Sequence, residues 1–187
     1  MRILRRTATV LAASVVLLGV WVTPGIAGVE PQVEQGALAS FEGGTIDMSE
    51  GWQGAQTCAV FATDDVRCYG SAEAADRATG YDRATDPLAA KATARELAAL
   101  PACADDWLCL YQYKDGDGRR LIFQDEKWQN LEEYGFNNMT SSWRNNQDDA
   151  GYLAGGTWGA GWVLVRDGKS YASEMGSYDN DATSVRG

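Results

Sequence analysis

Phe136–Arg144 reads Phe-Asn-Asn-Met-Thr-Ser-Ser-Trp-Arg, and the pattern returns at Tyr178–Arg186 as Tyr-Asp-Asn-Asp-Ala-Thr-Ser-Val-Arg, 42 residues later. Both copies carry an aromatic residue, Asn or Asp, Asn, two free positions, Ser or Thr, Ser, a strand-forming residue and Arg. Upstream, the two glycines of Gly116–Gly118 match those of Gly159–Gly161. The sequence therefore contains two tandem units of about 40 residues. One unit buries too little apolar surface alone, so we expect the two to pack face to face as a β-sandwich.

Strands are predicted on both sides of the first glycine turn. Trp107–Gln112 and Arg119–Gln124 are rich in aromatic and aliphatic residues, and glycine-rich turns replace helical periodicity from Cys103 onward. Residues 103–187 are therefore predicted to be mainly β, with a two-unit β-sandwich at the C-terminus.

Residues 28–102 have a different character and are predicted to form a small hairpin-plus-helix segment. In chain order this segment would hold a loose arm at Val29–Gln56 with a short strand at Thr45–Met48, a hairpin at Cys58–Tyr69, a helix from Ser71 to Arg77 capped by Ser71, and a helix at Leu88–Leu100 that Pro101 ends. The segment could be a propeptide that is removed before the C-terminal domain acts.

The four cysteines allow three disulfide pairings. Cys58 and Cys68 lie symmetrically about Thr63, so they would face each other across the two strands of the hairpin. Of the three pairings, the local one is preferred: Cys58 with Cys68, and Cys103 with Cys109. Each short loop would contribute roughly 2–3 kcal/mol to the free energy of unfolding.

Residues 1–27 have the order of a secretory signal peptide. Three arginines come first, an apolar run from Ala8 to Val22 follows, and Gly25–Ala27 supplies small residues at a cleavage site. A membrane anchor is the alternative, but the run is shorter than the roughly 20 residues that span a bilayer. We therefore expect cleavage after Ala27, and a secreted, extracellular protein with no membrane partner once the signal is removed.

The composition excludes several functions. The chain has 187 residues, a formal net charge of -10 and no histidine. Without histidine there can be no Ser-His-Asp or Cys-His nucleophile system and no His-based zinc site, so we expect a protein that is not an enzyme. A strongly acidic surface repels nucleic acid and anionic membranes. We expect a monomer.

The repeated motif is rich in hard oxygen atoms. Two carboxamide or carboxylate side chains, a hydroxyl and bent backbone carbonyls lie within six residues, and calcium takes six to eight oxygen ligands in irregular geometry. The alternative is that these residues bond their own backbone in turns, as Asn, Asp, Ser and Thr often do. The two interpretations are compatible, because a hydrogen-bonded loop is a preorganised site.

The two units resemble the Greek-key motifs of βγ-crystallins, and the repeated motif resembles the calcium-binding signature of microbial members. Cys103–Tyr111, Gly116–Leu121, Trp128–Leu131 and Tyr134–Trp143 are similar to a secreted actinobacterial family of peptidase inhibitors related to the Streptomyces metalloproteinase inhibitor. The resemblance implies a βγ-crystallin-like fold and inhibition of an extracellular protease, with metalloproteases as the target class. The chain departs from the pattern at Ala154, where crystallin units carry tyrosine, and it has no matching reactive-site motif.

The resemblance also implies a ligand set for calcium. Four residues would serve each loop: Asn137, Asn138, the Met139 carbonyl and Ser141 in the first; Asp179, Asn180, the Asp181 carbonyl and Thr183 in the second. Few of these ligands are anionic, so we expect weak binding, with dissociation constants on the order of 0.1–1 mM, and no requirement for the ion.

Two further functions stay open. The first is a calcium-binding extracellular module without a protease target. The second is a carbohydrate-binding module, because exposed tryptophans bind sugar rings. Trp158 lies among Gly155, Gly156 and Gly159 and is the predicted partner-contact residue, whereas Trp128 and Trp143 are expected in the core.

Overall fold

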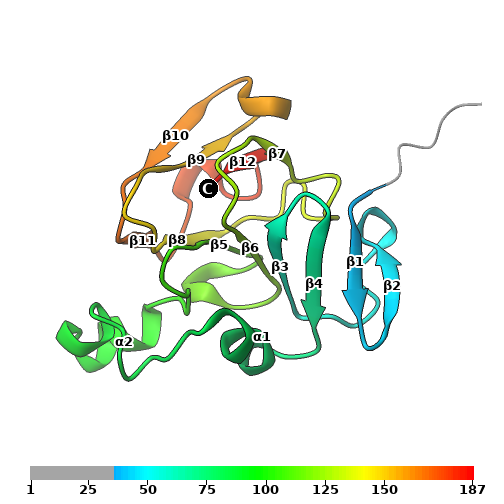
Figure 1. Ribbon diagram of the computed structural model, residues 1–187. Helices are drawn as coiled ribbons and strands as arrows, with labels where there is room; N and C mark the ends of the chain where they lie inside the picture. The colour runs from blue at the N-terminus through cyan, green and yellow to red at the C-terminus, as the bar shows by residue number, and fades with distance from the viewer. Residues whose placement is uncertain (1–35) are drawn as a thin grey trace, which may run out of the picture. The chain divides into compact units, whose positions relative to one another are not determined.

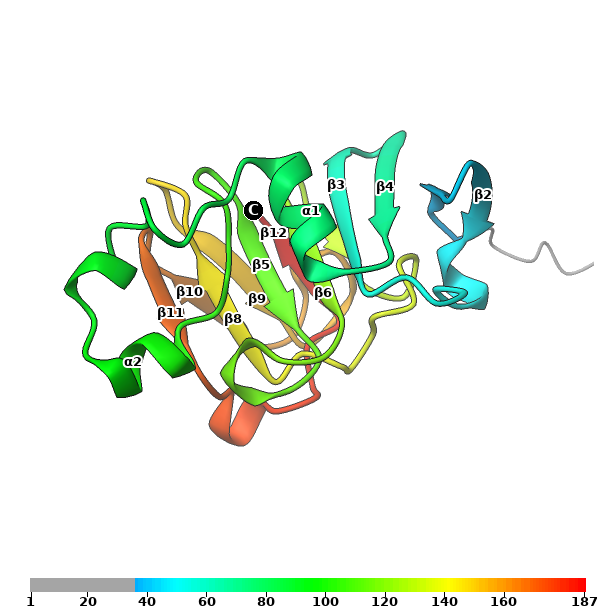
Figure 2. The same ribbon diagram turned by 90° about the horizontal axis from the view of Figure 1, so that it is seen from below.

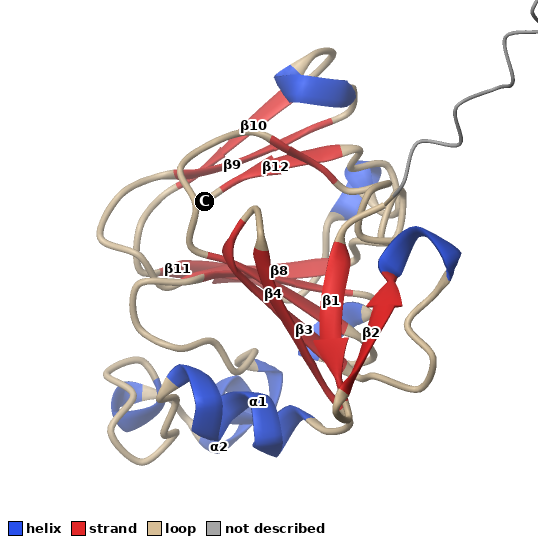
Figure 3. Cartoon of the chain, turned by 45° about the vertical axis from the view of Figure 1, so that its right-hand side comes forward, coloured by secondary structure: helices blue, strands red, loops and turns tan. Residues whose placement is uncertain are grey.

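The computed structural model describes residues 36–187, and these residues belong to one compact unit. The predicted signal peptide, residues 1–27, lies outside the described residues. Two β-sheets pack against each other, and both helices lie on the side of the larger sheet that faces away from the smaller one (Figure 1, Figure 3). Within this part of the chain no helix is long and apolar enough to span a bilayer.

Eight strands form the larger sheet, in the order β11-β8-β5-β6-β3-β4-β1-β2. Their bounds are β1 Leu38–Phe41, β2 Gly44–Asp47, β3 Thr57–Ala62, β4 Asp65–Tyr69, β5 Leu108–Tyr111, β6 Arg120–Phe123, β8 Ser142–Asn145 and β11 Ser170–Ala172. Four strands form the smaller sheet, in the order β10-β9-β12-β7. Their bounds are β7 Gln129–Asn130, β9 Gly151–Ala154, β10 Val163–Arg166 and β12 Ser184–Arg186.

Each predicted unit forms a four-stranded Greek key. In the first unit β5 pairs antiparallel with β6 and β8, while β7 crosses to the smaller sheet and pairs with β12. In the second unit β9 pairs with β10 and β12, while β11 crosses to the larger sheet and pairs with β8. The units therefore exchange their third strands, and the predicted mainly-β, two-unit Greek-key sandwich is confirmed.

The core between the sheets follows from strand alternation. Leu108 and Leu110 of β5 point into it and meet Leu153 of β9 and Val185 of β12, all fully buried. The intervening residue, Cys109, points to the outer face of the larger sheet, where it joins a second apolar cluster. Because side chains alternate with period two, this sheet is buried on both faces over the first unit.

A serine from each repeated motif locks the hairpin of its own unit. Each serine hydroxyl accepts a hydrogen bond from a glycine N–H at 3.0 Å and donates one to a backbone carbonyl at 2.6 Å. The bonds join Ser142 to Gly116 and Tyr113 in the first unit, and Ser184 to Gly159 and Gly156 in the second. These matching bonds explain why both motifs keep Ser at this position.

Residues 36–56 are not the loose arm that their composition predicts. β1 and β2 extend the larger sheet, because β1 pairs parallel with β4. Trp52 is 4% exposed, stacks on Phe136 with ring centroids 5.7 Å apart, and donates from Nε1 to the Tyr134 carbonyl at 2.7 Å. One large aromatic residue anchors this polar stretch to the sandwich core, and composition alone does not reveal such a contact.

The predicted hairpin and first helix are confirmed. The hairpin is β3–β4, and it joins the crystallin-like part of the sheet because β3 pairs parallel with β6. The larger sheet therefore runs across the predicted boundary between residues 102 and 103. Helix α1 spans Ala72–Thr79, with Ser71 accepting from the Ala74 N–H as its N-cap. Seen from below, α1 lies in front of the larger sheet (Figure 2).

The second predicted helix, Leu88–Leu100, is wrong as a single element. It divides into a 3-10 turn at Ala89–Lys91 and helix α2 at Ala94–Ala99. Thr93 and Glu96 form a capping box, in which each side chain bonds the backbone N–H of the other residue. Such a box starts a new helix, so it interrupts the alanine-rich run.

Two buried arginines attach the segment from α1 to Pro101 to the sandwich. The Arg144 guanidinium forms two hydrogen bonds with Asp86, at 2.6 and 2.9 Å, and a third with the Pro101 carbonyl at 3.0 Å. Arg120 bonds Asp76 at 2.6 Å and the Ala102 carbonyl at 2.7 Å. The sequence shows Arg144 only as the last residue of the repeated motif. It does not reveal the ion pair with Asp86, which lies 58 positions away.

Both predicted disulfides are confirmed. Cys58 pairs with Cys68 across the β3–β4 hairpin, and Cys103 pairs with Cys109 at the start of β5. No free cysteine occurs among the described residues.

Candidate functional site

The two Asn/Asp-rich loops of the repeated motif lie side by side. The Asn138 N–H donates to the Ala182 carbonyl at 2.9 Å, and the Asn180 N–H donates to the Thr140 carbonyl at 3.0 Å. Asn138 and Asn180 also share a left-handed backbone, with φ of 54° and 55°, a conformation that Asn tolerates better than most residues. Each loop thus makes the same backbone contact to the other, as in an approximate two-fold arrangement. The fold brings the predicted ligand residues into one region.

The close pairs of side-chain oxygens come from opposite loops. The Ser141 hydroxyl donates a hydrogen bond to Asn180 Oδ1 at 3.4 Å, and the Thr183 hydroxyl donates one to Asn138 Oδ1 at 3.5 Å. Two oxygens that each lie about 2.4 Å from one calcium ion, at a right angle, are separated by about 3.4 Å. A cation would therefore take a hydroxyl from one loop and an amide oxygen from the other. The sequence pattern groups the ligands loop by loop and does not reveal this exchange.

The remaining predicted ligands differ in their surroundings. Asn137 Oδ1 is buried and accepts no hydrogen bond within residues 36–187, and such an atom gains from a cation or a donor. The Asp179 carboxylate is exposed and accepts from Asn180 Nδ2 at 3.4 Å. The Asp181 carboxylate accepts from Trp162 Nε1 at 2.9 Å. The predicted ligand atom of Asp181 is its backbone carbonyl, as it is for Met139.

The donor set suits a hard cation held weakly. The close pairs consist of hydroxyl and carboxamide oxygens, and among the described residues no three His, Cys, Asp or Glu side chains form a metal-binding group. Neutral oxygen ligands match calcium in type, but they contribute little charge.

Trp158 forms a second candidate site, at the tip of the β9–β10 connection. Its side chain is 62% exposed, and its backbone is left-handed, with φ of 54°. Its N–H donates to Asn130 Oδ1 at 2.9 Å. The corresponding residue of the first unit is Asp115, with φ of 57°. Aspartate tolerates this conformation, whereas a bulky aromatic residue does so only under strain.

The glycines around Trp158 make its turn rigid. A Cβ at Gly159 would lie 2.4 Å from the Trp128 ring, and one at Gly155 would lie 2.1 Å from Trp162 Nε1. Both glycines therefore let the turn pack directly against indole rings. The result is an exposed ring on a fixed backbone, an arrangement that reduces the ordering cost of binding.

These features define residues 103–187 as a βγ-crystallin-like Greek-key pair, an assignment that rests on the strand order. Similar solved structures include the N-terminal domain of protein S, at 20% identity and a TM-score of 0.39, covering 43% of this chain and 92% of that one. A βγ-crystallin from Ciona intestinalis is 19% identical, with a TM-score of 0.38, and covers 43% of this chain and 96% of that one.

Residues 97–163 match the model of peptidase inhibitor family I36. The match begins in α2, covers the whole first Greek-key unit and continues through β9 and the Trp158 turn. The resemblance to this family that the sequence motifs predict is thus confirmed for this region. No curated protein matches the sequence.

Proposed function

We propose that this protein is a secreted inhibitor of extracellular metallopeptidases. The observation that carries the proposal is the match of residues 97–163 to a peptidase inhibitor family. The target class follows from the resemblance of the Cys103–Trp143 motifs to the Streptomyces metalloproteinase inhibitor. The partner is therefore an extracellular peptidase.

The Trp158 turn supplies the contact in this proposal. A peptidase cleft accepts a side chain in a pocket, and a large ring such as Trp158 fills a deep apolar one. Tryptophan is also over-represented among residues that dominate binding energy. Because the turn is packed on Trp128 and Trp162, it enters the cleft without being ordered first. The same packing opposes the distortion that peptide hydrolysis needs, so the bound turn would leave slowly and intact.

Secretion is supported by the chemistry of the cysteines. All four are paired, and disulfides persist in oxidising compartments outside the cell. The basic start and apolar run of residues 1–27 would deliver the chain there.

The test is a titration of a thermolysin-like metallopeptidase with the purified chain from residue 28 onward. Subtilisin, a serine peptidase, serves as the control. We expect metallopeptidase activity to fall with a sharp break near equimolar protein, and subtilisin to stay active. Unchanged metallopeptidase activity at a hundredfold excess would overturn the proposal. Inhibition of both enzymes would support inhibition but contradict the target class.

We propose calcium binding as a second function, because the paired hydroxyl and amide oxygens of the two loops have the separation of ligands that share one ion. Ser141 with Asn180, and Thr183 with Asn138, would hold the ions, together with the Met139 and Asp181 carbonyls. A bound ion would tie the two units together at their loops. At a calcium concentration tenfold above the dissociation constant, each site would add about 1.4 kcal/mol to the free energy of unfolding.

Thermal melting with and without calcium tests this second function. We expect calcium to raise Tm by roughly 3–6 °C per site, and magnesium to raise it less, since magnesium demands a regular octahedron. The Thr183→Val variant should lose part of the shift. Thr45→Val, an exposed change on β2, should keep it. A Tm that does not respond to 10 mM calcium would rule out the site.

A further inference from the structure

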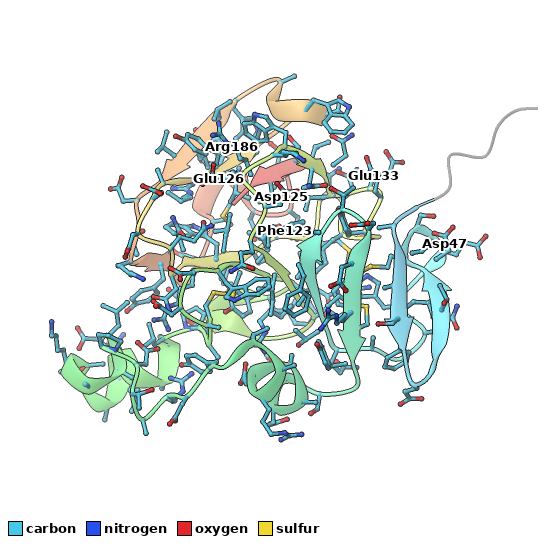
Figure 4. The ribbon with its side chains drawn as sticks, viewed as in Figure 1. Asp47, Phe123, Asp125, Glu126, Glu133 and Arg186 are labelled. Carbon is cyan, nitrogen blue, oxygen red and sulfur yellow. A yellow bond between two sulfur atoms is a disulfide. The ribbon has the colours of Figure 1, made fainter. Side chains whose placement is uncertain are left out.

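A cavity of about 640 Å³ lies at one end of the sandwich. It falls in the size range of small-molecule sites. Four segments meet there: the loop before β5, the loop after β6, the connection between β8 and β9 with the start of β9, and the end of β12. The Gly187 N–H bonds the Asp125 carbonyl at 3.2 Å. Figure 4 shows Glu126 and Arg186 close together at this end of the molecule. The lining residues that matter here are Asp106, Glu126, Gln147, Asp149, Tyr152 and Arg186.

The Arg186 side chain forms no ion pair and no hydrogen bond within residues 36–187, although it shares the cavity with several carboxylates. Its guanidinium lies over the Tyr152 ring, 5.2 Å from the centroid, and its Nε atom is buried without a partner. Gln147 Oε1, in the same lining, is also buried without a partner. The Nε atoms of Arg120, Arg144 and Arg166 are also buried without a partner, so the Gln147 oxygen is the more informative of the two atoms, because buried acceptors are nearly always hydrogen-bonded.

The first Greek-key unit shows what this arginine position requires. Arg144 of β8 corresponds to Arg186 of β12, and each stands opposite the equivalent strand, Arg144 across from Cys109 and Arg186 across from Tyr152. Arg144 is fully buried and bonded to Asp86 from the chain itself. No described segment covers Arg186 in this way. A ligand that enters the cavity would be the counterpart of Asp86 for Arg186.

The charge around Arg186 restricts that partner. Asp106, Glu126 and Asp149 line the cavity without a cationic partner among the described residues, while Asp148 pairs with Lys169 at 3.2 Å. The three unpaired carboxylates outweigh the single guanidinium, so an anionic ligand would be repelled and a cationic one attracted. An acceptor for Arg186 must therefore be a neutral oxygen.

A hydroxyl group meets these conditions, because it accepts from Arg186 and donates to Gln147 or a carboxylate at once. The Tyr152 side chain, which lines the cavity beside Arg186, offers apolar surface for a sugar ring. We propose that this cavity binds an oligosaccharide of amino sugars whose free ammonium groups face the carboxylates. The proposal is independent of peptidase inhibition, and it would place an inhibitor at a polysaccharide surface.

Isothermal titration in calcium-free buffer with glucosamine tetramer tests the proposal, with N-acetylglucosamine tetramer as the neutral comparator and trilysine as a cationic peptide. We expect glucosamine tetramer to bind most tightly and the acetylated tetramer at least tenfold more weakly. Arg186→Lys keeps the charge but lacks the Nε donor, and it should weaken glucosamine tetramer at least fivefold. Glu126→Gln should weaken glucosamine tetramer but not the acetylated one.

Glu42→Gln, in the exposed β1–β2 turn, removes the same charge as Glu126→Gln and should leave binding unchanged. Melting curves establish that each variant is folded. Absence of binding to both tetramers would overturn the proposal. Equally tight binding of trilysine would also overturn it, because the site would then recognise positive charge in a peptide. Calcium alone would overturn it as well, if it released heat that Glu126→Gln abolishes. Peptidase inhibition measured on Arg186→Lys should equal that of the unaltered chain, which separates this site from the inhibitory one.

Discussion

Trp158 carries two features that lower the stability of the fold. A left-handed backbone is unfavourable for any L-residue with a large side chain, and Trp158, a large apolar residue, is 62% exposed. Asp115 shows that the same turn in the first unit forms with a residue that suits it. A strained, exposed and rigidly supported ring is consistent with a binding role, because such strain persists where function uses it.

Trp158→Gly should therefore stabilise the fold and weaken inhibition. Glycine adopts positive φ without strain, so the free energy of unfolding should rise by about 0.5–1 kcal/mol. The apparent inhibition constant should increase at least tenfold. Chemical denaturation and peptidase titration measure the two effects. Asp115→Gly is the matched control, since it relaxes the equivalent turn of the first unit and should leave inhibition unchanged. Inhibition that survives Trp158→Gly would place the contact elsewhere.

Asp86 predicts an acid-sensitive contribution to stability. Burial raises the pKa of this carboxyl, but hydrogen bonds and charge from Arg144 outweigh that effect, so its pKa lies below the ordinary value. A lowered folded pKa means that the contribution is present above the unfolded pKa, about 3.9. It is lost as pH falls through the folded pKa. Stability should thus decline steeply below about pH 4.

Asp86→Asn removes this titration and leaves Arg144 buried without a counter-charge. The free energy of unfolding at pH 7 should fall by about 3–5 kcal/mol, and its dependence on pH between 2 and 5 should flatten. Urea titrations across that range provide the measurement. Curves for the two proteins that stay parallel would show that Asp86 does not carry the acid sensitivity.

Among the elements, β3 joins the chain upstream of residue 103 to the sandwich. It pairs parallel with β6, and α1 and the following segment cover the outer face of the same sheet. Separation at residue 102 would expose the β6 edge and remove the partners of Arg120 and Arg144. An exposed edge strand is prone to pair with other chains. These contacts favour retention of residues 36–102 in the working protein.

Residues 103–187 expressed alone should consequently be much less stable than residues 28–187. Loss of the two buried ion pairs alone predicts a decrease of at least about 3 kcal/mol, with a tendency to associate. Thermal melting and analytical ultracentrifugation of both fragments test this. Equal Tm values and a monomeric short fragment would instead support the alternative that the upstream segment is a removable propeptide.

At the scale of the whole molecule, the two Greek-key units have unequal surroundings. The first carries an added strand on its β6 edge and helices on its outer face (Figure 3). In the second, no strand of residues 36–187 pairs with the outer edge of β10, and Val163 and Val165 are exposed. The Trp158 turn lies on this second unit, and the Arg186 cavity lies between its β12 and β9 strands and the loops of the first unit. The two repeated units thus have different surroundings, because the described chain covers the first more than the second.

Short-range patterns in the sequence carry much of this structure. The 42-residue repeat, the glycine turns, the Cys58–Tyr69 hairpin and the Ser71 cap each follow from residues a few positions apart, because turns, caps and alternation are local properties of the backbone. Both disulfides belong to this group, since each closes a short loop. The exposed position of Trp158 also follows from local sequence, because the neighbouring glycines predict a turn there.

Other features depend on residues that meet only after folding. The exchange of β7 and β11 between sheets, the parallel pairing of β3 with β6, the Asp86–Arg144 pair and the hydroxyl–amide pairs across the two loops join positions far apart in the chain. None has a local pattern, because burial and the alignment of two surfaces create these contacts. A single Asp or Arg looks like a solvated charge until the packing of the sheets encloses it.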